Sequence, residues 1–148
     1  MPFTFIKTVD ASAPVTALLH VDQVTIAAGQ LLAWDTSGYV SNFSVSAYVG
    51  TNAGVAEAGV TGSAVTAGVT TIPVQVNPQA VYLADTEGSA AATDIGINVN
   101  VTGAPSNILA EGTAKTNGLG RVKITKLVNT ITTSQCVECM INFGSETE

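Results

Sequence analysis

The chain has 148 residues, and its five Lys and Arg against eleven Asp and Glu give a net charge of −6, which argues against nucleic acid as a partner. Only 11% of the residues are charged and 46% are hydrophobic, whereas an average soluble protein carries roughly 25% charged residues. This composition excludes the densely charged surface of a typical monomer, so we expect partners to cover part of the outside. The start, MPFTFIKTVD, lacks the pattern of a signal peptide, and no apolar run reaches the length of about 18 residues that a transmembrane helix needs.

The chain begins with an apolar, extended segment, Phe3-Thr-Phe5-Ile6, and a loop-like segment follows it. Residues two apart share a face of a strand, so Phe3 and Phe5 point to the same side. We expect an extended N-terminal arm and loop at residues 1–20, a β domain at 21–143 and a short acidic tail at 144–148. Such an arm either completes its own sheet or lies on a neighbouring molecule.

Alternation of apolar and polar residues dominates the rest of the chain. The clearest hairpin joins Leu31-Leu-Ala-Trp34 to Tyr39-Val40 through the turn Asp35–Gly38. Period-two alternation also predicts strands at residues 43–49, 95–101 and 137–143. Many short strands separated by turn residues indicate a single small all-β domain, either a barrel or a sandwich, and a β-tulip is one compatible variant.

Residues 54–61, GVAEAGVT, approach the spacing of a phosphate-binding loop. That loop needs Lys where this chain has Val60, and Glu57 would place a negative charge beside the phosphate. A helix is disfavoured over residues 54–68, because each of the four glycines costs about 1 kcal/mol there. The stretch therefore predicts short strands and turns built from small residues, with glycine where two strands approach closely.

The residues that could support chemistry are few. Cys136 and Cys139 form a C-x-x-C, but zinc needs four ligands and His20 is the single histidine. Residues three apart in a strand face opposite sides, so we expect two packed thiols. The chain contains no G-x-S-x-G nucleophile elbow and no paired carboxylates. We therefore expect no enzyme activity, no cofactor and no metal.

Four of the five cations lie within twelve residues that contain no acid, at Lys115, Arg121, Lys123 and Lys126. One interpretation is a solvated strand face, and the other is contact with an acidic partner surface.

One part of the chain resembles a known family. It runs Ala28-Gly-Gln-Leu-Leu-Ala-Trp-Asp-Thr-Ser-Gly-Tyr-Val40, followed by Tyr48-Val-Gly and Gly54-Val-Ala-Glu57. This part is similar to the head decoration (capsid cement) proteins of tailed bacteriophages, including the lambda type. Those proteins carry a Gly-led strand, an L-x-A-W-D hairpin and then G-x-A. A looser likeness covers Thr71–Ala84 and Gly120–Leu127.

The resemblance implies a non-catalytic homotrimer, made in the host cytoplasm, that sits on the outside of the virion capsid. Such trimers occupy local three-fold positions of the expanded head and clamp neighbouring major capsid subunits, and neither a nucleic acid nor a membrane is their partner. Their N-terminal segment often adds a strand to the shell, and here Phe3–Val9 is at the matching end. We expect deletion of residues 1–9 to weaken shell binding and leave the domain folded.

The side chains expected to contact the capsid are Phe3, Phe5, Lys7, Arg121, Lys123 and Lys126. Trp34 and Tyr39 are expected to pack inside the domain or at the trimer interface. An alternative function is a tail- or fibre-associated domain, or a surface adhesin module, that binds a glycan or receptor.

Overall fold

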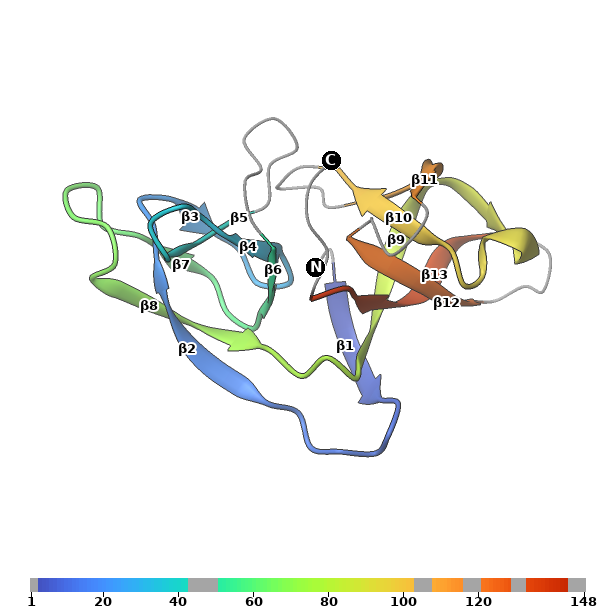
Figure 1. The fold of residues 1–148 in the computed structure, drawn as a ribbon, viewed down its shortest axis with the longest axis horizontal. Helices are drawn as coiled ribbons and strands as arrows, with labels where there is room; N and C mark the ends of the chain where they lie inside the picture. The colour runs from blue at the N-terminus through green and yellow to red at the C-terminus, as the bar shows by residue number, and fades with distance from the viewer. Residues whose placement is uncertain (1–2, 43–50, 103–107, 116–120, 129–132, 144–148) are drawn as a thin grey trace.

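The computed structural model describes residues 3–42, 51–102, 108–115, 121–128 and 133–143, and these form a small all-β domain. The fold class expected from the sequence is therefore confirmed. Two groups of strands lie side by side (Figure 1) and are called here the barrel and the large sheet. The strand expected at 43–49 lies outside the described residues. Within the described part of the chain, no helix is long and apolar enough to cross a membrane.

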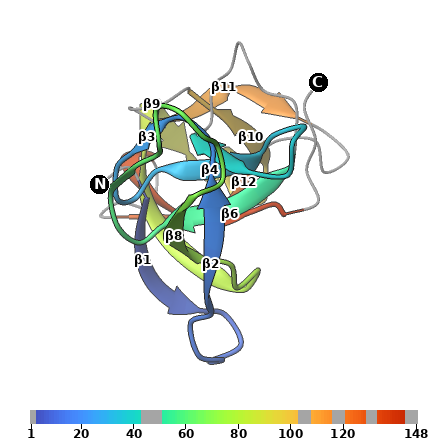
Figure 2. The same cartoon turned by 90° about the vertical axis from the view of Figure 1, so that its left-hand side faces the viewer.

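The barrel is closed by five strands. In order around it these are β2 (Thr16–Val21), β5 (Val40–Asn42), β4 (Leu31–Trp34), β6 (Asn52–Ala56) and β8 (Thr70–Gln75). Strands β2 and β5 pair in parallel, with Val21 opposite Val40, and the other neighbours are antiparallel. The short strands β3 (Thr25–Ile26) and β7 (Val60–Thr61) pair beside it. Figure 2 views the molecule from the barrel side. The core of the barrel is made of small and branched apolar side chains: Val21, Ile26, Leu32, Val40, Ala53, Ala56, Ile72 and Val74.

The hairpin expected from the sequence is present as β4 and β5, with Trp34 opposite Val40. Asp35 fixes its turn, because Oδ1 accepts the backbone N–H of Ser37 at 2.8 Å and of Tyr39 at 2.9 Å. This is the turn chemistry by which a short acidic side chain replaces a backbone acceptor.

The large sheet has six strands in the order β1-β9-β11-β10-β12-β13. Their bounds are β1 (Phe3–Thr8), β9 (Ala80–Ala91), β10 (Asn98–Val101), β11 (Leu109–Lys115), β12 (Val122–Leu127) and β13 (Thr133–Ile141). Strand β13 also pairs with β9, from Thr133 opposite Ala91 to Met140 opposite Val81. Strands β9, β11, β10, β12 and β13 are therefore joined in a ring of pairings, and β1 pairs with β9 outside this ring.

Two of the strands expected from alternation fall in this sheet. Strand β13 covers most of 137–143, and Val137, Cys139 and Ile141 are buried as the alternation predicts. Strand β10 begins later than expected, at Asn98. A 3₁₀ turn, η1 (Ala92–Asp94), precedes it, and Gly96 has a φ of +86°. Because of that turn, the extended backbone begins only after Gly96.

The expected extended N-terminal arm is not confirmed. Strand β1 is an integral strand antiparallel to β9, with Phe3 opposite Ala84, so the segment completes the chain's own sheet. Phe3 is 1% exposed, and its ring meets the ring of Tyr82 edge-on at a centroid distance of 6.1 Å. The Phe3 N–H also donates to Gly29 O at 3.0 Å, which joins β1 to the barrel side. Deletion of residues 1–9 would remove a core side chain, so, contrary to the expectation from the sequence, we expect it to destabilise the domain.

The stretch 54–68 consists of thin strands and turns, as expected from its glycines. Gly54 lies in β6 with a φ of +140°, and a Cβ there would clash with the Gln75 carbonyl on β8. Gly68 has a φ of +81°, and a Cβ there would enter the ring of Tyr39. Both positions need glycine because the backbone conformation and the close approach exclude a side chain.

We predict that Phe3→Ala lowers the free energy of unfolding by about 3 kcal/mol or more, because it leaves a cavity in the core. Ile6→Ala is the matched control on the same strand, where the side chain is 38% exposed, and we expect its loss to be well under half as large. Urea denaturation of both variants measures the difference. Equal losses would show that β1 is held by its backbone pairing and not by Phe3.

Candidate functional site

Two lysines expected to bind a partner lie on the outer face of the large sheet. Lys123 stands opposite Met140, and Lys126 stands opposite Glu138. Residues three apart in a regular strand face opposite sides, but the register shifts between Ile124 and Lys126. This bulge places both lysines on the solvent side, and both are exposed.

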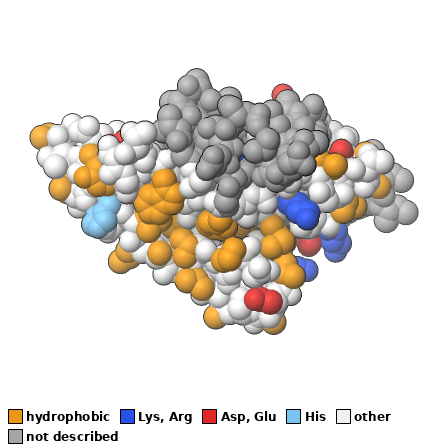
Figure 3. Space-filling model, in the orientation of Figure 1, with side chains coloured by type: hydrophobic (Ala, Val, Ile, Leu, Met, Phe, Trp, Pro, Cys, Tyr) orange, Lys and Arg blue, Asp and Glu red, His pale blue; other side chains and the backbone are white. Residues whose placement is uncertain are grey.

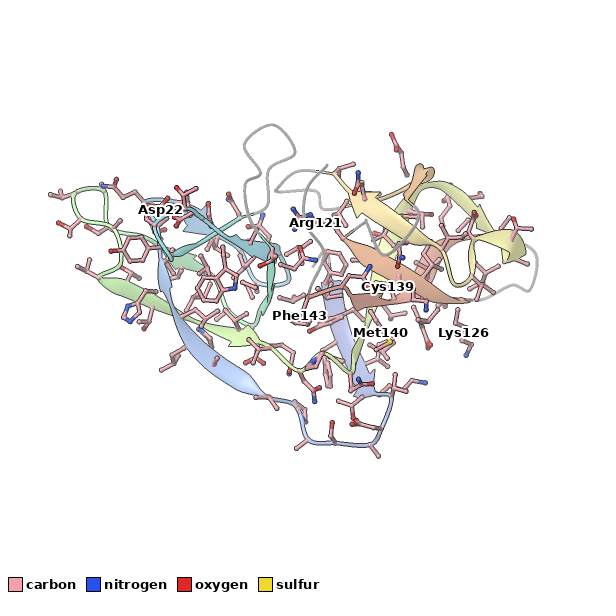
Figure 4. All side chains as sticks on the ribbon, viewed as in Figure 1. Asp22, Arg121, Lys126, Cys139, Met140 and Phe143 are labelled. Carbon is pink, nitrogen blue, oxygen red and sulfur yellow. The ribbon has the colours of Figure 1, made fainter. Side chains whose placement is uncertain are left out.

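Lys7 reaches the same region from β1. The register runs from Lys7 to Val81 on β9, from Val81 to Met140 on β13, and from Met140 to Lys123 on β12. Lys7 and Lys126 also line one hollow of about 350 Å³, together with Glu138. We call Lys7, Lys123 and Lys126 the basic face. Figure 3 shows Lys and Arg side chains gathered over the right half of the molecule, and Figure 4 labels Lys126 there.

Arg121 does not belong to the basic face, and its side chain is buried where a contact with the capsid was expected. Its side chain is 2% exposed, and Nη1 donates a hydrogen bond to Asn52 Oδ1. Burial lowers the pKa of the Arg121 guanidinium to about 9, so the side chain keeps its charge at neutral pH. Figure 4 places Arg121 between the barrel and the large sheet. The side chain of Lys115 lies outside the described part of the chain.

Asn52 is the centre of the polar cluster that holds Arg121, and it is itself buried. Its Nδ2 donates to Arg121 O at 2.9 Å and to Asn142 O at 2.8 Å. Asn142 in turn donates from Nδ2 to Asn98 Oδ1 at 3.0 Å. Asn52 lies on β6 of the barrel, whereas the other three residues belong to or flank β12, β13 and β10. No sequence pattern indicates this cluster, because its members are far apart along the chain.

A second exposed surface is apolar and comes from the first twenty residues. We call it the N-terminal apolar face. In Figure 3, hydrophobic side chains gather below the middle of the molecule, over β2, β8 and the segment that joins β1 to β2. Its members and their exposed fractions are Phe5 38%, Ile6 38%, Val9 61%, Val15 49% and Leu18 69%. Phe5 is therefore placed where a partner can contact it, whereas Phe3 is not.

Trp34 and Tyr39 both have packing roles within the chain. Trp34 is half-buried and packs against the barrel core. The ring of Tyr39 lies against Gly68. A contact of either side chain across a trimer interface stays a prediction.

The two cysteines behave as packed thiols in a strand. Cys139 is buried, Cys136 is half-buried, and neither is in a disulfide. Burial raises the pKa of both thiols, and the charge of Asp85 adds to the effect at Cys136, which disfavours the reactive thiolate form. His20 is exposed, with Nδ1 2.9 Å from Gly68 O. The described residues contain no group of three or more His, Cys, Asp or Glu side chains placed to hold a metal ion.

Comparison with known proteins gives no further assignment: no family model matches the sequence, and no curated protein and no solved structure matches it significantly.

We predict that Asn52→Ala lowers the free energy of unfolding by roughly 3 kcal/mol, because it removes two buried hydrogen bonds to Arg121 and a half-buried one to Asn142. Asn42→Ala is the matched control, since Asn42 donates one exposed bond of 3.0 Å to Thr25 O, and we expect a loss of about 1 kcal/mol or less. Chemical denaturation followed by Trp34 fluorescence provides the measurement. A loss no greater than that of the control would mean that Asn52 does not join the two groups of strands.

Proposed function

We propose that this chain is a bacteriophage capsid decoration protein, a homotrimer that binds the outside of the assembled head and clamps neighbouring major capsid subunits. The observation that carries the proposal is the position of β1. Strand β1 is the terminal strand in the order of the large sheet. It carries Phe5 and Ile6 of the N-terminal apolar face and Lys7 of the basic face. Apolar area, cationic charge and a sheet edge thus meet on one exposed element.

The sheet edge supports attachment by strand addition. Exposed edge strands pair readily with another chain unless they are covered, and addition of a strand is a recurrent way of binding an extended segment. Strand β1 pairs with β9 on one side, and its Phe3 N–H already donates to Gly29 O. A capsid segment that pairs with β1 beyond Phe3 would also cover Phe5 and Ile6. The segment Phe3–Val9 was expected to add a strand to the shell, whereas here we propose that β1 accepts a strand from the capsid.

The basic face supports an acidic partner surface. The net charge of the chain is −6. The three lysines of the basic face form a local positive surface that can attract acidic groups of a partner despite this net charge. Exposed ion pairs are individually weak, at about 0.2 to 1 kcal/mol each. Binding through them needs many copies, and a trimer that engages several capsid subunits at once supplies that avidity.

We predict that Lys123→Gln/Lys126→Gln reduces the occupancy of empty expanded heads, because it removes two charges from the basic face. Thr36→Glu/Thr66→Glu is the control, since both threonines are exposed on the barrel side and this pair lowers the net charge by the same amount. Co-sedimentation with heads at about 50 mM and about 300 mM salt measures the occupancy, and binding is expected to fall with salt in the unmodified chain because salt screens exposed charges.

Equal binding of the lysine pair and the control pair, with no effect of salt, would remove the basic face from the proposal. Failure of the unmodified chain to bind heads, combined with binding to host cells, would instead favour the adhesin alternative.

A further inference from the structure

A pocket of about 310 Å³ lies where β1 and β9 of the large sheet meet β6 and β8 of the barrel. Its apolar lining comes from both sides, with Phe3, Phe5 and Tyr82 on one and Val55 on the other. The rings of Phe3 and Phe5 each lie 6.1 Å from the ring of Tyr82, at interplanar angles of 86° and 73°. Three aromatic rings in nearly perpendicular pairs therefore contribute to one wall.

The Tyr82 hydroxyl has no hydrogen-bond partner among the described residues, although it is buried and Tyr82 is 1% exposed. A buried hydroxyl without a partner is costly, and Tyr82 lines the pocket. Burial raises the pKa of the Tyr82 phenol, and the charge of the Glu57 carboxylate adds to the effect. The hydroxyl thus stays protonated, and within the described chain it uses neither its donor nor its acceptor capacity.

Glu57 contributes the one charged side chain in the described lining of the pocket. Its carboxylate accepts hydrogen bonds from Thr16 Oγ1 at 2.9 Å and from Gln75 Nε2 at 3.4 Å. Gln75 is buried and its Oε1 accepts from the backbone N–H of Val15 at 2.9 Å and of Asn77 at 3.0 Å. Glu57 is therefore held at the rim by a partner that is itself fixed.

We propose that this pocket binds an alkylammonium group, a primary amine cation on a short aliphatic stem. Aromatic rings attract a cation within about 6 Å of their centroids, and the Glu57 carboxylate supplies the opposite charge. The apolar lining suits the stem, as such surfaces suit the methylenes of lysine. The same carboxylate disfavours an anion. The inference does not depend on the capsid proposal, because it concerns the isolated chain.

The test compares n-butylammonium with 1-butanol, its neutral counterpart, by ¹H–¹⁵N chemical shift titration of the full chain. We expect shifts at Ala56, Glu57 and Phe5, with butylammonium bound at least about tenfold more tightly than butanol, which corresponds to about 1.4 kcal/mol. Absence of shifts in the pocket, or equal binding of the two compounds, would overturn the proposal and leave a pocket that holds water or any apolar molecule.

Two variants test which side chains of the pocket produce the preference for butylammonium over butanol. Glu57→Gln keeps the size of the side chain, and it should abolish the preference for the cation. Tyr82→Phe keeps the aromatic ring, so it should leave the preference for the cation unchanged while the thermal midpoint stays the same or rises, because the hydroxyl it removes has no partner in the described chain. Asp85→Asn is the control carboxylate outside the pocket and should change neither quantity. An unchanged preference in Glu57→Gln would also overturn the proposal.

A third ligand separates the two sources of such a cation. Nα-acetyl-lysine methylamide carries the same ammonium and stem on a peptide backbone that must remain outside the pocket. Binding at least as tight as that of butylammonium would identify a lysine side chain of a protein partner as the ligand. Binding of butylammonium alone would identify a free small amine.

Discussion

The hydrogen bonds of Asn52 are the interaction on which the arrangement of the molecule depends. One side chain from the barrel accepts a hydrogen bond from the Arg121 guanidinium and donates to the backbone carbonyls of Arg121 and Asn142. A buried charge without polar partners is strongly destabilising, and the hydrogen bond to Asn52 Oδ1 gives the Arg121 guanidinium a polar partner between the two groups of strands. The Arg121 N–H also donates to Val99 O, and the Asn142 N–H donates to Arg121 O. The cluster thus fixes the ends of β12 and β13 beside β10 and against β6 at once.

This junction also decides what the outside of the molecule presents. With the barrel held beside the large sheet, Phe3 is enclosed and Phe5, Ile6 and Lys7 are left on the exposed part of β1. The pocket lined by Tyr82 and Glu57 exists because β1 and β9 come from one group and β6 and β8 from the other. A chain with few charges can afford such surfaces when a permanent partner covers them, and this consideration links the composition to the proposed attachment to a capsid.

Local pattern was enough to predict the elements that depend on local chemistry. The hairpin at Asp35 followed from its turn residues, and the burial of Val137 and Cys139 followed from alternation. These features depend on neighbours in sequence, so the printed residues contain the information.

The remainder depended on contacts between distant segments. Nothing near Arg121 in the sequence distinguishes it from Lys123, yet one is enclosed by Asn52 and the other is exposed. The bulge after Ile124 that brings Lys126 to the same face as Lys123 is set by the pairing with β13. Likewise, Phe3 alternates with Phe5 as an exposed arm would, and only the pairing of β1 with β9 places it in the core.

Cryo-electron microscopy of empty expanded heads mixed with the purified chain tests the proposed binding of a trimer to the assembled head. We expect added density on the outer surface at the local three-fold positions, with three copies of the fold at each and β1 facing the shell. Bare three-fold positions at low salt and excess protein would contradict it.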